Sequence, residues 1–472
     1  MSRLQFLTHL LSHPTPAGIV ELLGIGVVGL ACLYLLTKLS PTWQISLALC
    51  AEAFSGFWKL MGVELPLDRL LVVTGLGTLL LGGIGLYSGR RVKVRWFHLL
   101  LLVVATYGVC SAIGAGTITT SLGFYALLDR LGLIPFLLFA LSPHLFGTKH
   151  QRNVLLVVII VFGAYLGLTA LAEEARFNAL VLPHYILNDS IGITTGRVRG
   201  PYANAEADGM IMTLGAIGAG IGLTEWRARW SRVGCWLVII VCAIGVFLTL
   251  TRAVWIGAAA GLVVASVVDT RVRRRVLALL VIGSLGVVAA LLIPEVRTRV
   301  LDRVNTTSSI WDRLNMYSAG FRVLAEHPVF GIGWVNFPQY SLLAMRQAAG
   351  YPITAVGLEI HDVFLARLVD FGLVGGSLTI LALVWIILCG CRRVSPELES
   401  WRVGFLTYSA MFVSVAAFAP LAAPEPTLAF WLLAGIATRD QFSVPRHALL
   451  PAEGSWEREA GPDVGVAIGA YS

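Results

Sequence analysis

The sequence predicts an all-α polytopic membrane protein with about twelve transmembrane helices and a long helical loop outside the membrane. Of its 472 residues, 57% are hydrophobic and only 13% are charged, whereas a soluble domain carries about 25% charged residues. The mean hydropathy is +0.80, and apolar runs reach the roughly 17–25 residues needed to cross about 30 Å of hydrocarbon. The net charge of +8 is explained by Lys and Arg in cytoplasmic loops, so nucleic acid is not an expected partner.

Two of the apolar runs are weak. The run at 42–61 contains Glu52 and Lys59, and the run at 427–438 is short. If 17–61 crosses the membrane once, the chain has twelve helices and a cytoplasmic N-terminus; if it crosses twice, there are thirteen and the N-terminus is outside. The cost of two charged residues inside a span favours twelve. The expected spans are 17–37, 42–61, 68–87, 96–114, 121–141, 153–172, 204–223, 233–250, 252–268, 276–293, 361–388, 401–419 and 427–438.

Basic residues in the short loops orient these spans, because Lys and Arg accumulate on the cytoplasmic side. Basic clusters occur at 90–95, 149–152, 227–232, 271–275 and 392–402. From residue 68 onward, the loops at 115–120, 173–203, 250–252, 294–360 and 420–426 then all lie outside. The chain is therefore divided into transmembrane helices at 1–293 with an external loop at 173–203, an extracytoplasmic loop at 294–360, C-terminal transmembrane helices at 361–438, and a cytoplasmic tail at 439–472 that is expected to be disordered.

The long external loop contains a helical pattern at 311–326. Leu314, Tyr317, Phe321 and Leu324 share one helical face, and we expect this face to pack on the membrane domain. His327-Pro328 ends the helix, and the glycines at 331 and 333 form a turn.

Arg199 precedes Gly200-Pro201 at the outer mouth of the expected 204–223 helix. It is either an arginine that extends to the membrane interface or an anion ligand, since backbone N–H groups and the helix dipole favour an anion at a helix N-terminus. Arg197, two residues earlier, is interpreted as an interfacial arginine.

Arg252 lies between two apolar runs with hardly any loop. An arginine at a helix centre costs about 2.5–3.5 kcal/mol and less near the end, so one kept in such a place usually has an anionic partner. Glu206, Asp208 or a substrate phosphate could fill that role, and a guanidinium group binds phosphate through two parallel hydrogen bonds.

His361 opens the apolar run at 361–388. A lone histidine is more often structural than catalytic, but the loop orientation places Arg199, Arg252 and His361 on the same side of the membrane. Three polar groups on one side of an apolar protein suggest that they form a functional site there. Metal binding is weakly supported, because the sequence has neither an HExxH motif nor an Asp-x-Asp pair in an external loop.

Four segments resemble the O-antigen ligase and O-antigen polymerase superfamily, over roughly residues 190 to 380. They are His361-Asp362 followed by Gly372 and Gly375, Thr251-Arg252-Ala-Val-Trp255, Arg199-Gly-Pro-Tyr-Ala-Asn204, and Arg313 with the stretch from His327 to Phe337. Asp362 departs from the Asn, Ser or Gln that usually follows this histidine. A carboxylate here could raise the pKa of His361 and change the pH profile.

The resemblance implies a C-type glycosyltransferase-like fold in the bacterial cytoplasmic (inner) membrane, with its active site on the extracytoplasmic side. Such an enzyme transfers a glycan from undecaprenyl diphosphate to a hydroxyl of a lipid or saccharide acceptor, as in lipopolysaccharide and other cell-envelope polysaccharide biosynthesis. His361 would be the catalytic base, and Arg199 and Arg252 would hold the diphosphate in place of a metal ion. Arg313, Asn204 and Asp362 would be supporting residues, and no cofactor is expected.

Two alternatives remain open. A repeat-unit polymerase of the same superfamily would share the donor site with a ligase, and the sequence does not separate the two. A polytopic transporter of lipid-linked glycans is less favoured, because the sequence has no inverted repeat and no sign of interrupted helices that carry charge at the bilayer midplane.

Overall fold

The computed structural model describes residues 34, 38–61, 66–81, 90–92, 94–192, 196–305, 308–346, 352–353 and 357–445. Helices dominate this part of the chain, and six of them are long and apolar enough to cross a membrane. The prediction of a helical multi-pass membrane protein is therefore confirmed, whereas the count of about twelve spans stays a prediction. The expected first span at 17–37 lies outside the described residues, apart from residue 34.

The six long apolar segments agree with six of the expected spans. They are α6 (Trp96–Gly114), the composite segment Ser121–Leu145, α9 (Lys149–Glu174), α10 (Ala205–Glu225), α11 (Arg229–Leu248) and α17 (Val363–Gly390). The other apolar helices are α3 (Pro41–Ala51), α4 (Leu67–Leu81), α12 (Arg252–Val268), α13 (Thr270–Leu291), α18 (Glu399–Ala416) and α19 (Glu425–Ala437). The external loop contributes α14 (Pro294–Asn305), α15 (Ser308–Glu326) and α16 (Phe337–Ala344).

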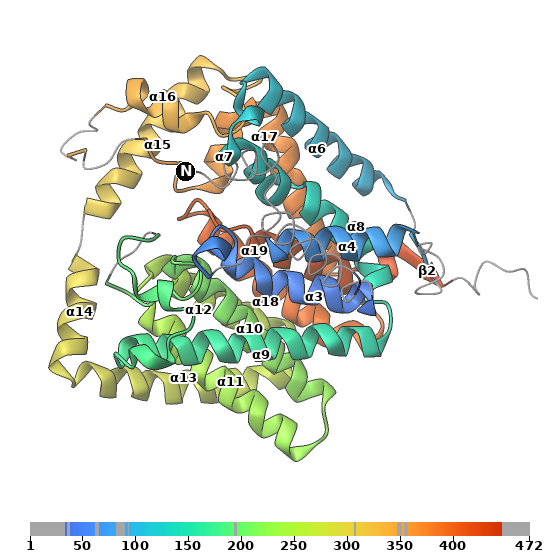
Figure 1. Ribbon diagram of the computed structural model, residues 1–472, viewed down its shortest axis with the longest axis vertical. Helices are drawn as coiled ribbons and strands as arrows, with labels where there is room; N and C mark the ends of the chain where they lie inside the picture. Colours follow the sequence, from blue (N-terminus) through green and yellow to red (C-terminus); the bar gives the residue numbers. More distant parts are fainter. Residues whose placement is uncertain are drawn as a thin grey trace, which may run out of the picture.

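The helices pack around a central group formed by α10, α12, α18 and α19. Helix α18 lies against α10, α12 and α19, while α19 also packs on α8 (Leu133–Leu145). Helix α17 contacts α6 and α15, and Figure 1 shows these three helices with α16 in the upper part of the view. Helix α14 rises along the left edge of Figure 1 and connects α13 to α15. The external-loop helices are thereby brought next to the start of α17.

The weak run at 42–61 does not form one helix. Helix α3 has 11 residues and rises about 16 Å, which is about half of a 30 Å hydrocarbon layer. Two short 3₁₀ turns, η1 (Glu52–Phe54) and η2 (Trp58–Met61), follow it. The Glu52 carboxylate is buried and lies 3.7 Å from the Arg69 guanidinium. The interruption at Glu52 agrees with the expectation that this segment does not cross the membrane by itself.

The expected span at 121–141 is composite. Helix α7 (Ser121–Ala126) passes into the π-type turn η4 (Leu127–Leu131), and α8 begins two residues later. A wide turn of this kind inserts an extra residue into the helix and often occurs at functional sites. Here it carries Asp129, which is buried, and Arg130. The sequence showed no sign of interrupted helices that carry charge, and this segment is an exception.

Helix α15 confirms the predicted helix in the external loop, and two residues of its predicted packing face, Tyr317 and Leu324, are partly buried against a cluster that includes Leu365 of α17. Leu314 and Phe321 are exposed, with 37% and 61% of their surface accessible. The buried side instead contains Met316, Ala319 and Val323. Ala319 and Val323 pack in a cluster with Ile360 and Leu365, next to His361. Small residues allow α15 to approach α17 closely, so the packing face is shifted from the predicted one but still includes Tyr317 and Leu324.

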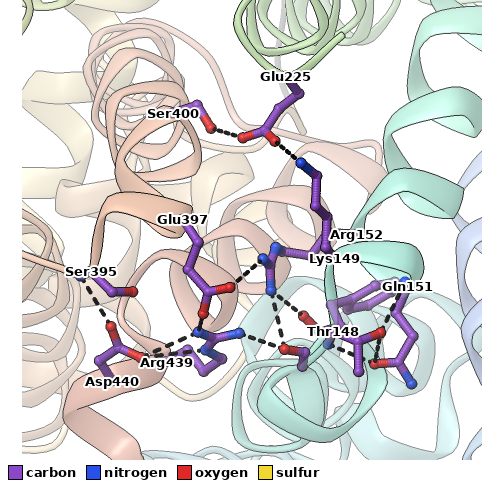
Figure 2. A network of polar contacts seen from close by, with 12 residues as sticks. Thr148, Lys149, Gln151, Arg152, Glu225, Ser395, Glu397, Ser400, Arg439 and Asp440 are labelled. Atoms are coloured by element: carbon purple, nitrogen blue, oxygen red, sulfur yellow. Dashed lines mark hydrogen bonds and ion pairs between the residues drawn. The ribbon is translucent and has the colours of Figure 1, made fainter.

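Four segments that the sequence assigns to the cytoplasmic side meet in one polar network (Figure 2). The Glu397 carboxylate, in η7 (Pro396–Leu398), accepts hydrogen bonds from Arg439 and, at 3.3 Å, from Arg152. Glu225 at the end of α10 accepts a hydrogen bond of 2.7 Å from Ser400 and lies 3.8 Å from Lys149. The common location of these segments agrees with the alternation of loops deduced from the basic residues.

The start of the expected disordered tail requires correction. Residues Arg439–Phe442 form the short helix α20, and Ser443–Pro445 form strand β2. Strand β2 pairs antiparallel with β1 (Arg90–Val92). Arg439 is 1% exposed and donates to the carbonyl of Gly147 and to Glu397. The network of Figure 2 therefore holds the chain in place beyond residue 438, and the rest of the predicted tail, 446–472, lies outside the described residues.

Candidate functional site

His361 lies in the last irregular segment before α17 and is half-buried. Its Nδ1 atom is 3.1 Å from the backbone carbonyl oxygen of Glu359. Its own carbonyl accepts a hydrogen bond of 3.0 Å from the Tyr317 hydroxyl on α15. The external loop and the mouth of α17 therefore position this histidine together.

Asp362 is the N-cap of α17. Its Oδ1 atom accepts hydrogen bonds from the backbone N–H groups of Phe364 at 2.8 Å and Leu365 at 3.0 Å, which is the usual way in which an aspartate begins a helix. The carboxylate is thus occupied by the helix end. Its position in the sequence after the histidine is explained by capping, a role that Asn and Ser perform equally well.

The pKa of His361 is lowered from its usual value of 6.5, opposite to the effect suggested for Asp362. Burial is the main cause, and the positive charge of Arg313 adds to it. The Glu359 carbonyl and the charges of Glu359 and Asp312 offset part of the effect. The imidazole is therefore neutral at pH 7 and able to accept a proton.

Three arginines from separate elements form one electrostatic cluster. The pKa of Arg197, in the loop before α10, is lowered by burial and by the charges of Arg252 and Arg313. The pKa of Arg313, on α15, is lowered by burial and by Arg252, while Tyr317 and Glu206 raise it. Because Arg313 also acts on His361, the cluster adjoins the histidine. Glu206 offsets part of this positive charge, and guanidinium groups that lie near one another suit a phosphate ligand, which each can bind through two parallel hydrogen bonds.

Arg199 has a different environment from Arg197. It is 3% exposed, and its guanidinium donates to the carbonyls of Ile191 at 2.6 Å, Asn188 at 2.7 Å and Ile186 at 3.1 Å. These bonds fold the external loop around the side chain. The structure therefore brings Arg252, Arg313 and His361 together, and places Arg197 with them where the sequence suggested Arg199.

Asn204 also has a structural role. It is the N-cap of α10, and its Oδ1 atom accepts a hydrogen bond of 2.9 Å from the N–H of Glu206. Glu206 and Asp208, the two carboxylates suggested as partners of Arg252, have different surroundings. Glu206 acts electrostatically on Arg313, whereas Asp208 is fully buried and its oxygens make no hydrogen bond to the described residues.

Helix α17 is interrupted at Gly372, where φ is +65° and ψ is −173°. The external-loop segment 328–334 fits into this interruption. Ile332 and Gly333 donate to the carbonyls of Val369 and Asp370 at 3.0 and 2.9 Å, and Leu373 donates to the carbonyl of Pro328 at 2.7 Å. Backbone groups freed by the interruption are thus satisfied by the loop, as buried backbone groups require. The break explains Gly372 in the motif and is a second interruption that the sequence did not indicate.

Trp334 fixes the end of the inserted segment. It is fully buried and stacks on Phe371 with ring centroids 5.4 Å apart. The Arg367 guanidinium lies over its indole ring at 4.5 Å and is 3.2 Å from the Asp370 carboxylate. The Trp334 indole N–H donates to the carbonyl of Gly123 at 3.0 Å, which ties the loop to α7.

A second contact between distant segments joins Arg130 of η4 to Glu359. The guanidinium donates to both carboxylate oxygens, at 3.1 and 2.5 Å, and to the carbonyl of Pro420 at 3.2 Å. A cleft beside this pair is lined by Arg130, Arg367 and mainly apolar side chains of α17, α18 and α19. Sequence reasoning did not identify Arg130, because only the fold brings it to the segment that contains His361.

Among the described residues, no group of three or more His, Cys, Asp or Glu side chains is arranged to hold a metal ion. The positively charged residues around His361 are instead suited to an anionic ligand.

Comparison with known proteins agrees with the motifs. Residues 237–380 match the family described as O-antigen ligase, which confirms the resemblance to that superfamily and supports a ligase-type or polymerase-type function in polysaccharide biosynthesis. The match to this family implies that the substrates belong to the general class of lipid-linked glycans. The matched segment includes Arg252, Arg313, His361 and Gly372. No curated protein matches the sequence.

Proposed function

We propose that the chain, which carries an O-antigen ligase domain at residues 237–380, transfers a glycan from undecaprenyl diphosphate to an acceptor hydroxyl without a metal ion. The observation that carries this proposal is the gathering of Arg197, Arg252 and Arg313 next to a half-buried, neutral His361. The reaction would take place on the extracytoplasmic side of the bacterial inner membrane, in a protein of about twelve spans.

The arginine cluster would bind the diphosphate of the donor. A guanidinium group forms two parallel hydrogen bonds to phosphate oxygens, and three such groups would stabilise the charge that develops on the leaving diphosphate. We assign this role to Arg252, Arg197 and Arg313. Arg199, the other residue expected to bind the diphosphate, is less suited because its guanidinium is bonded to loop carbonyls.

His361 would act as the general base. Its Nε2 atom would take the proton of the acceptor hydroxyl as that oxygen forms a bond to the anomeric carbon of the donor sugar. The bond from the same carbon to the phosphate oxygen breaks, and undecaprenyl diphosphate leaves with the electron pair. A neutral imidazole with a pKa near or below the working pH is suited to this step.

The cleft between α17, α18 and α19 supports a donor that carries a long lipid. Its walls include Val363, Leu383, Phe412 and Trp431, and Val363 is two residues from His361. An isoprenoid chain that lies against these apolar side chains would leave its diphosphate near the mouth of α17.

The experiment that tests this function uses the purified full-length protein in lipid vesicles. Undecaprenyl diphosphate-linked glycan is extracted from a strain lacking the protein and supplied with lipid A core from the same strain. We expect glycosylated lipid A core to form at the same rate with and without EDTA, because arginines replace the metal. Loss of transfer in EDTA would contradict the metal-free mechanism.

The same strain separates the two enzymatic alternatives. If the missing protein is a ligase, long glycans remain on the lipid carrier because they are not transferred to the acceptor. If it is a polymerase, only short units remain on the carrier. Short units, together with absent transfer to lipid A core, would therefore reject the ligase and favour the polymerase. Movement of intact donor across the bilayer without any new glycosidic bond would favour the transporter.

Replacing Arg252 or Arg197 with glutamine is expected to weaken binding of undecaprenyl diphosphate by about 10–100-fold, since a hydrogen bond to a charged group contributes about 1.5–3 kcal/mol. The matched control is Arg199→Gln, which should lower the thermal stability of the external loop and have the smaller direct effect on affinity. Equilibrium binding and thermal unfolding, measured on each variant in nanodiscs, check this. If only Arg199→Gln binds undecaprenyl diphosphate more weakly than wild type, and its thermal stability is unchanged, then Arg199 rather than Arg252 or Arg197 binds the diphosphate.

A further inference from the structure

Arg130 and Glu359 form an ion pair between two segments 229 residues apart in the sequence. Both carboxylate oxygens are engaged, and the side chains are 10% and 26% exposed. A paired contact of this kind restricts orientation as well as distance. Because Arg130 also donates to the carbonyl of Pro420, it connects η4, the segment before α17 and the segment between α18 and α19.

Glu359 continues this connection to the imidazole of His361 through its backbone. A carbonyl oxygen only accepts hydrogen bonds, so the contact of 3.1 Å between that oxygen and Nδ1 of His361 requires the proton of the neutral ring to be on Nδ1. The lone pair is then on Nε2, which is the atom that must accept the proton of the acceptor hydroxyl. The position of the Glu359 backbone therefore selects the reactive tautomer.

Regular secondary structure does not hold this backbone. Residues 357–362 are irregular, and α17 begins at Val363. On one side of the segment, Tyr317 bonds to the carbonyl of His361. On the other side, Arg130 bonds to the side chain of Glu359. Without the ion pair, Glu359 would lose its side-chain contact with η4, and the position of its backbone carbonyl would no longer be fixed from that side.

We propose that Arg130 and Glu359 are a positioning pair for His361, which fixes the imidazole in the tautomer with a basic Nε2 and holds it at the mouth of α17. The proposal rests on the proposed function for its catalytic consequence. Neither residue contacts the reacting atoms in this role. Arg130 acts on Glu359, and Glu359 acts on the ring.

The charges around His361 give the pair a signature that a purely structural contact would lack. Glu359 and Asp312 favour the protonated ring, whereas Arg313 disfavours it. Glu359 is itself ionised. Burial raises its pKa, but Arg130 and other nearby positive charges lower the pKa by more, so the net change is downward. Replacing Glu359 with glutamine removes a negative charge from the neighbourhood of the imidazole, so the pKa of His361 should fall.

The test measures the histidine directly. Full-length protein in nanodiscs is treated with diethyl pyrocarbonate over a range of pH, and modification of the His361 peptide is followed by mass spectrometry. Glycan transfer is measured in parallel with extracted undecaprenyl diphosphate-linked glycan. We expect Glu359→Gln and Arg130→Gln to shift the modification profile of His361 and to lower kcat on the order of 10–100-fold, with KM for the donor changed less than about threefold. Arg130→Lys should restore part of kcat, since the charge remains but the two parallel bonds are lost.

Asp129→Asn is the matched control, because Asp129 precedes Arg130 on η4 and pairs with Arg69 instead. It should lower stability without moving the His361 profile. An unchanged profile in both Glu359→Gln and Arg130→Gln would overturn the positioning role, even where kcat falls. A wild-type protein that transfers no glycan would reject the proposed function instead, and the modification profile would still decide whether the pair controls the ring.

Discussion

Replacing His361 with alanine is expected to reduce the rate of glycan transfer by about 10²–10⁴-fold, the usual contribution of a positioned general base. Donor affinity should change little, because the diphosphate is assigned to the arginines. The ring lies beside α17 and α15 with only part of its surface buried, so alanine leaves Asp362 free to cap α17. Single-turnover transfer, measured with saturating donor, separates the chemical step from binding.

The wild-type pH profile checks the same assignment. The pKa of His361 is lowered from 6.5, so the basic form predominates at pH 7 and is lost as the pH falls through the lowered pKa. Transfer should therefore be level near neutral pH and decline only in acid. His184→Ala, at an exposed position of η6 (His184–Leu187) in the external loop, is the control and should retain the wild-type rate and profile. Normal transfer by His361→Ala would remove the histidine from the mechanism.

The helical spans were predictable because membrane insertion is decided largely by local composition. The expected runs at 96–114 and 252–268 have the same bounds as α6 and α12. Continuous apolar residues must form helices in hydrocarbon, since their backbone groups find no water there. The sidedness of the loops stays a prediction from the basic residues, and it placed Arg252 and His361 on the same side of the membrane before any tertiary contact was known.

Local sequence favoured Arg199 over Arg197 as an anion ligand, because the Gly200-Pro201 turn directly follows Arg199. Both precede the Gly200-Pro201 turn, and the difference between them depends on the carbonyls of residues 186–191, which fold back around Arg199. The role of Arg130 was likewise hidden, because its partner Glu359 is far away in the sequence. Side-chain direction at such sites is set by long-range contacts, for which hydropathy and spacing contain no signal.

The interruption of α17 has the same origin. An apolar run that contains three glycines is compatible with a continuous helix, and only the inserted loop segment 328–334 shows why the backbone departs from helical geometry. The loop supplies donors and acceptors to the interrupted turn, so the break is stable although it is buried. The glycines of the motif are therefore explained by the loop that docks there, as much as by the histidine that precedes them.

Replacing Gly372 with alanine is expected to displace the external loop from α17. At φ +65° and ψ −173°, a residue with a side chain is strained by about 1–3 kcal/mol. A Cβ atom at this position would also lie 2.2 Å from the carbonyl oxygen of Val329 and 2.5 Å from the backbone nitrogen of Phe330, so the loop backbone leaves it no room. The loop bonds at Leu373 and Val374 should be lost together, and glycan transfer should fall with them because Tyr317 and Arg313 belong to the same loop.

Thermal unfolding and limited proteolysis in nanodiscs measure this effect, with cleavage expected to increase between residues 328 and 346. Gly220→Ala is the matched control, since a Cβ there meets no atom within 4 Å and alanine favours a helix over glycine by about 1 kcal/mol. Loss of transfer with an intact, protease-resistant loop in Gly372→Ala would show that the glycine acts on the site by another route. Wild-type stability and transfer in that variant would mean that the turn at 372 adopts ordinary helical geometry in the membrane.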